Sequence, residues 1–161
     1  MRQADSWTGV RLNDGPNTHS RIIKADLFNP IERDNIVLPN TPDVILCNPI
    51  GAFGLDHIRG LSIQDWSIFM QSFYDWAYTR LTSNEGVFVS ELMYFIPDGV
   101  YYKEWPEYYR FMMGIYADSL TEQNVDINIP ALENPELAIR SMVIKKHPES
   151  PSELPYIHIE I

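Results

Sequence analysis

A short segment near the first third of the chain carries the residues best suited to chemistry. The apolar run that follows Asp43 ends at Asn48 and Pro49. An asparagine carboxamide offers one acceptor oxygen and two N–H donors, and a proline stiffens the turn and removes a backbone donor. Asn48 can therefore bind a planar amine and hold its lone pair in line for attack on an electrophile. The alternative is that Asn48 and Pro49 only end a strand.

A second polar residue ends an earlier strand. Residues 21–25 predict a strand that ends at Asp26, which precedes Asn48 by 22 residues. The run at 43–47 does not alternate, which is typical of a strand covered on both faces in a parallel sheet. Ligands of such sheets bind outside the carboxyl ends of the strands. Asp26 and Asn48 are therefore expected to border one ligand site.

The remaining pattern alternates strands with helices and places Pro30, Pro39 and Pro42 in a loop at 27–42. The other expected elements are strands at 8–12, 87–93, 125–129 and 139–146 and helices at 63–81 and 105–121. This order predicts an α/β fold with a mostly parallel, Rossmann-like sheet and helices on both faces. We expect one domain over residues 1–161, with a polar N-terminal segment at 1–20 and a proline-rich C-terminal tail at 147–161. A short final strand at 156–161 is an option.

The motif at 43–54 resembles that of class I S-adenosylmethionine-dependent methyltransferases of the adenine-N6 and amino-methylating type. In that family an Asn/Asp-Pro-Pro-aromatic motif follows a strand that begins with Asp. Asp26-Leu27-Phe28 is similar to the family's preceding acidic strand end, and Pro97-Asp98-Gly99-Val100 is similar to a segment of type I restriction modification subunits. The resemblance covers about residues 21–146. It implies a partial methyltransferase fold, S-adenosylmethionine as the cofactor, and DNA methylation or restriction-modification as the setting.

The resemblance also implies roles for particular residues, without a metal ion. Asn48 and the Pro49 carbonyl would position the nitrogen nucleophile, and Ile50 and Phe53 would form the wall of the substrate site. Asp26 and Leu27 would contact the adenine of the cofactor, and Asn48 would also lie at the cofactor. Catalysis would be mainly orientation for in-line methyl transfer.

Two features depart from the family pattern. Ile50 and Gly51 stand where the family has its second proline and its stacking aromatic residue, a place that Phe53 takes only if the loop is rearranged. The Gly-rich loop that cradles the methionine end of the cofactor is absent from the 25 residues before Asp26. The chain thus resembles the later part of the fold, with the start removed, replaced or supplied by a partner chain. A catalytically inactive interaction subunit is the second hypothesis, and a small-ligand-binding α/β protein is the third.

Composition restricts the partners. The 161 residues include 12 basic and 22 acidic side chains, for a formal charge of −10, and residues 81–161 alone carry −8. Because an acidic surface repels phosphates, binding of nucleic acid is expected only beside a basic partner domain or chain. No apolar run reaches the roughly 18 residues of a membrane span, so no membrane partner is expected.

The single cysteine and the scattered histidines argue against two other kinds of site. Cys47 alone excludes an internal disulfide framework and a Cys-rich zinc site. Its place inside a strand favours an inert thiol over a nucleophile. The four histidines do not fall at ligand spacings, so no metal is expected. A reducing cytoplasm is the expected location.

Overall fold

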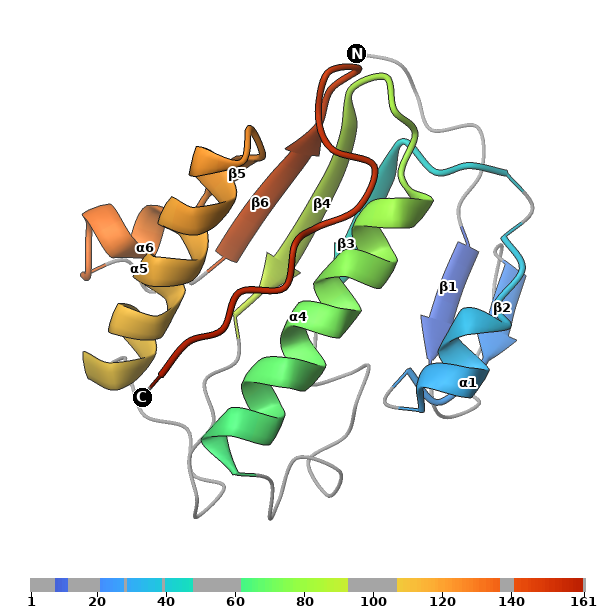
Figure 1. The fold of residues 1–161 in the computed structure, drawn as a ribbon. Helices are drawn as coiled ribbons and strands as arrows, with labels where there is room; N and C mark the ends of the chain where they lie inside the picture. The colour runs from blue at the N-terminus through green and yellow to red at the C-terminus, as the bar shows by residue number, and fades with distance from the viewer. Residues whose placement is uncertain are drawn as a thin grey trace.

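The computed structural model describes residues 8–11, 21–27, 29–38, 40–47, 62–92, 107–136 and 141–160. In chain order its elements are β1 (Thr8–Arg11), β2 (Arg21–Lys24), α1 (Pro30–Asp34), β3 (Val44–Cys47), α4 (Ile63–Arg80), β4 (Gly86–Glu91), α5 (Glu107–Glu122), β5 (Asp126–Asn128), α6 (Pro130–Glu133) and β6 (Ser141–Lys146). Figure 1 shows α4 and α5 on the same face of a sheet, with β1, β2 and α1 to one side.

The main sheet has four strands in the order β3-β4-β6-β5. β3 and β4 are parallel, whereas β6 runs antiparallel to both β4 and β5. β1 and β2 form a separate parallel pair. The α/β class is therefore confirmed, but the expectation of a mostly parallel sheet is not met in the four-stranded sheet. Antiparallel neighbours need no long helical crossover, and the short α6 is the described helix between β5 and β6.

Packing of α4 against β4 forms the centre of the core. Ser62 caps α4 by accepting a hydrogen bond from the Asp65 backbone N–H at 3.0 Å. Further along the helix, the Phe73 and Tyr74 rings lie 6.2 and 5.8 Å from the ring of Phe88 in β4. All three side chains are buried. Burial of each apolar ring stabilises the fold by roughly 1.5–3 kcal/mol.

Most expected elements lie within about two residues of their predicted positions, but the expected loop at 27–42 is wrong in part. It contains α1, which begins at Pro30. The Asn29 side chain accepts a hydrogen bond from the Ile31 N–H at 3.0 Å and so caps this helix. A proline in the first helical turn has no intrahelical N–H partner to lose. Pro30 therefore starts a helix here instead of breaking one.

The segment at 147–160, which we call the strap, is packed and not a free tail. Leu154 and Ile159 belong to the core, and Figure 1 shows the strap running between α4 and α5. Gln71 of α4 donates to the carbonyl of Ile157 and accepts from its N–H, both at 2.8 Å. Asp75 accepts from the Leu154 N–H at 2.7 Å. No strand forms at 156–160, because side chains of a helix take the place of a neighbouring strand.

At the other end of the sheet, His147 lies between two carboxylates. Its Nδ1 is 3.0 Å from Glu85 Oε1, and its Nε2 is 3.1 Å from Asp126 Oδ2. The hydrogen bonds that His147 makes to Glu85 and then to Asp126 raise the pKa of His147 above its ordinary value, against a smaller opposing effect of desolvation. The protonated ring, which donates from both nitrogens, fits this arrangement.

The Gln71 pair gives a prediction for stability. Gln71→Ala leaves a partly buried backbone N–H and carbonyl of the strap without their partner, so we expect the free energy of unfolding to fall by about 1–3 kcal/mol in urea titrations. The matched control is Gln123→Ala, because the exposed side chain of Gln123, just after α5, donates to the nearby Ser119 carbonyl. Its loss should stay within about 0.5 kcal/mol. Equal losses in the two variants would contradict the role given to Gln71.

The His147 cluster gives a second prediction. The pKa of His147 is higher in the folded than in the unfolded chain, so its contribution to stability is full below pH of about 6.5 and is lost as the pH rises through the folded value. Urea unfolding of the wild type between pH 5.5 and 8.5 should show this decline. His147→Gln should flatten the curve over that range. A variant curve parallel to that of the wild type would count against the assignment.

Candidate functional site

The predicted site lies at the carboxyl ends of β2 and β3. β3 ends at Cys47, directly before the motif. Four of the predicted site residues, Asn48, Pro49, Ile50 and Phe53, lie outside the described residues. The direction of the Asn48 amide therefore stays a prediction, and the structure describes only the Asp26 side of the site.

Asp26 lies in a turn that α1 holds in place. Its carbonyl accepts a hydrogen bond from the Asn29 N–H at 3.1 Å. Its own N–H donates to Glu32 Oε2 of α1 at 2.9 Å. The Asp26 side chain is half-buried, and that of Leu27 is only 5% exposed and belongs to the core. The backbone of Asp26 is therefore held at both its N–H and its carbonyl, and Leu27 is packed in the core.

Helix α1 also joins this turn to the main body of the protein. The Arg33 guanidinium donates to Ser72 Oγ at 2.7 Å. Trp76 Nε1 donates to the Arg33 carbonyl at 3.1 Å, and Arg80 donates to the Asp34 carbonyl at 3.3 Å. These contacts fix α1 against α4, so the end of β2 has a defined place relative to the core. The sequence analysis missed this connection, although Asn29-Pro30 is a recognisable helix start.

Cys47 stands beside Ser90 in the register of β3 and β4. Burial raises the pKa of the Cys47 thiol to about 12, although a hydrogen bond with Ser90 acts in the opposite direction. At neutral pH the thiolate is thus scarce, and the thiolate is the reactive form of cysteine. We therefore expect the residue next to the motif to be an inert thiol and not a nucleophile.

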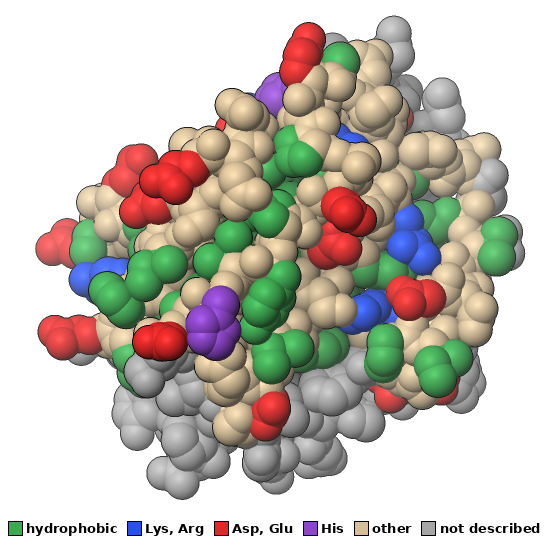
Figure 2. All heavy atoms as spheres, in the orientation of Figure 1, with side chains coloured by type: hydrophobic (Ala, Val, Ile, Leu, Met, Phe, Trp, Pro, Cys, Tyr) green, Lys and Arg blue, Asp and Glu red, His purple; other side chains and the backbone are tan. Residues whose placement is uncertain are grey.

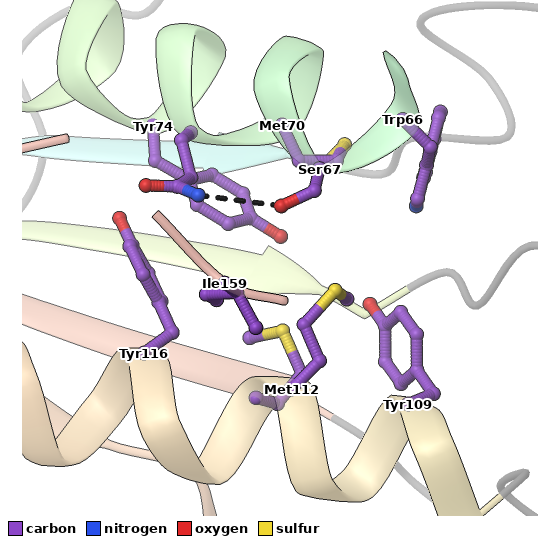
Figure 3. A pocket seen from close by; sticks show the side chains of 10 residues that line it. Trp66, Ser67, Met70, Tyr74, Tyr109, Met112, Tyr116 and Ile159 are labelled. Carbon is purple, nitrogen blue, oxygen red and sulfur yellow. Dashed lines mark hydrogen bonds between the residues drawn. The ribbon is translucent and has the colours of Figure 1, made fainter. Parts of the chain in front are cut away.

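A small cavity lies between α4, α5 and the strap (Figure 3). Its volume is about 20 Å³, and its walls include Trp66, Tyr109, Met112 and Tyr116. Among the described residues, Tyr116 OH and Trp66 Nε1 have no hydrogen-bond partner. This volume holds about one water molecule. The cavity is therefore too small for an organic cofactor, and any such ligand must bind elsewhere.

The surface charge agrees with the acidic composition. In Figure 2 red carboxylate side chains gather over the α5 side of the molecule, while blue and red side chains are mixed nearer α1 and α4. Across the described ranges, no three His, Cys, Asp or Glu side chains are grouped to hold a metal ion. Within the same ranges, no helix combines the length and the apolar character that a membrane crossing needs.

No protein-family model, curated protein or solved structure matches this chain. The features that bear on the function of the chain are therefore its motif and the placement of the elements around that motif.

The environment of Cys47 gives a testable expectation. In the folded protein its alkylation by iodoacetamide at pH 8 should be at least about tenfold slower than that of a free cysteine, because burial raises its pKa. Addition of 8 M urea should restore the ordinary rate, which mass spectrometry follows directly. Rapid alkylation of the folded chain would show that the thiol is activated.

Proposed function

We propose that the chain is an S-adenosylmethionine-dependent N-methyltransferase domain, or part of one, that acts on adenine in nucleic acid. The observation that carries the proposal is the placement of the two strand ends. In Figure 1 the arrows of β1, β2 and β4 point the same way, and β3 is parallel to β4. The end of β2 with Asp26 and the end of β3 before Asn48 therefore face the same end of the molecule.

The residues fit one part of a cofactor site. Asp26 is half-buried and its backbone is held at both the N–H and the carbonyl, so its side chain would contact the cofactor adenine without a change of the turn. S-adenosylmethionine would supply the electrophilic methyl group. Asn48 would orient the nitrogen nucleophile, with the Pro49 carbonyl beside it, and Ile50 and Phe53 would wall the substrate. The missing glycine-rich loop would come from a partner chain or from another segment, and a cytoplasmic location belongs to the same proposal.

One observation favours the second hypothesis, an inactive interaction subunit. Val44 and Leu46 in β3 are exposed, as expected of a surface that another protein covers. The two hypotheses share the fold and differ in whether the strand ends hold a cofactor. Binding of S-adenosylmethionine separates them.

Calorimetric titration tests the proposal. We expect S-adenosylmethionine to bind the chain, or its complex with a partner, with micromolar affinity.

Asn48→Ala should lower the rate of methyl transfer to adenine-containing DNA at least about a hundredfold, because orientation of the nucleophile is lost. The melting temperature should stay unchanged. The matched control is Asn40→Ala, since Asn40 is exposed before β3, and it should keep full activity.

If S-adenosylmethionine binds neither the chain nor its complex with a partner, the hypothesis of an enzyme is overturned and that of an inactive interaction subunit is left. Full activity of the Asn48→Ala variant would overturn the role of the motif.

A further inference from the structure

One face of the main sheet carries apolar side chains that are not part of the core. The register aligns Val44 with Val87, and Leu46 with Val89. β4 and β6 extend the second row to Val143. Side chains alternate across a strand, so these five residues share one face, which we call the open face. None of them belongs to the core cluster, and Val44 and Leu46 are 54% and 76% exposed.

The row of side chains on the opposite face of the same strands is covered by the hydrophobic core. Ile45, Phe88, Ile144 and Ile127 are aligned in the neighbouring row of the same strands. Phe88 and Ile144 are completely buried, while Ile45 and Ile127 pack against the core. The two faces of β3 and β4 are therefore equally apolar in sequence but differ in cover.

The dimensions of the open face fit one helix. Its apolar residues span β3, β4 and β6, which at a strand spacing of about 4.8 Å is about 10 Å across. An α-helix with its side chains is about 10–12 Å wide. The row of Val44 and Val87 becomes polar within β6, at Lys145. The row of Leu46, Val89 and Val143 becomes polar one strand later, at Asn128 in β5. A second sheet would need a wider apolar surface than this.

The backbone edge of β3 borders the open face and offers a second place for a partner to bind. β3 is the end strand of the four-stranded sheet, and β1 and β2 form a sheet of their own. An edge strand presents backbone N–H and carbonyl groups to another strand. A strand that pairs with β3 in parallel would lead, through a right-handed crossover, to a helix over one face of the sheet. A strand and a helix together would thus cover both the edge and the open face.

Charge decides the kind of partner. The chain carries −10, and Asp43 and Glu91 lie exposed at the two ends of the strands that form the open face. The basic side chain that borders this face, Lys145, forms an ion pair with Asp126 at 3.9 Å. A second copy would bring the same negative charge to the surface, whereas a basic partner is attracted to it.

We propose that the open face and the β3 edge bind a strand and an amphipathic helix of a basic partner protein. The inference deepens the partner part of the proposed function and rests on it, but it does not depend on methyl transfer. It names Val44 and Leu46 as the centre of the contact.

Site-specific photocross-linking in cells of the source organism tests the proposal. Benzoylphenylalanine at position 46 should give one cross-linked product with a basic protein. The same group at position 111 should not, although Phe111 on α5 is 60% exposed. Peptide mapping should place the cross-link in a strand or an amphipathic helix of the partner. A product with twice the mass of the chain, or no product at position 46, would overturn the proposal.

The captured protein is then purified with the chain and its affinity measured. Leu46→Glu should weaken binding at least about tenfold, as loss of a central apolar contact does, and Phe111→Glu should leave binding unchanged. Since Leu46 is exposed, the melting temperature of the variant should match that of the wild type. Unchanged affinity of the Leu46→Glu variant for the partner would refute the proposed docking surface. Binding of S-adenosylmethionine, measured on the same samples, tests the proposed enzyme activity separately.

Discussion

The close approach of α4 to β4 is the constraint on which the rest of the fold depends. A Cβ atom added at Gly86 would lie 2.5 Å from the Thr82 carbonyl oxygen and 2.9 Å from Leu81 Cβ. Only a residue without a side chain allows the chain to turn from the helix into the strand at this distance. The turn sets Phe88 beneath Phe73 and Tyr74. Because β3 and β6 both pair with β4, this contact also decides where the strand before the motif ends.

The two sides of the candidate site differ in how they are held. The β3 side is part of the main sheet through its pairing with β4. The Asp26 side is attached through α1, whose contacts with α4 involve Arg33 and Trp76. A ligand that contacts both strand ends would therefore join two parts of the molecule that share no described backbone pairing.

The sequence predicted the strands and long helices well because their patterns are strong. The uninterrupted run at 43–47 and the periodic helix from 63 both appear where expected. It failed for α1 because Pro30 was taken as a breaker and not as a first-turn residue. It also failed for the strap, since nothing local reveals that Gln71 pairs with Ile157. The direction of β6 depends on long-range pairing, which local periodicity does not encode. For the site, the motif placed Asn48 after a strand, whereas the support of Asp26 by Glu32 required coordinates.

The attachment of the strap has a consequence for synthesis in the cell. Gln71 and Ile157 are separated by 86 residues, which at about 5–20 residues per second takes roughly 4–17 s to translate. Until the strap has been made, Gln71 and Asp75 of α4 lack the backbone groups that they bond in the folded protein. This side of α4 therefore stays uncovered for several seconds after the helix is made, and binding by a chaperone would protect it during that interval.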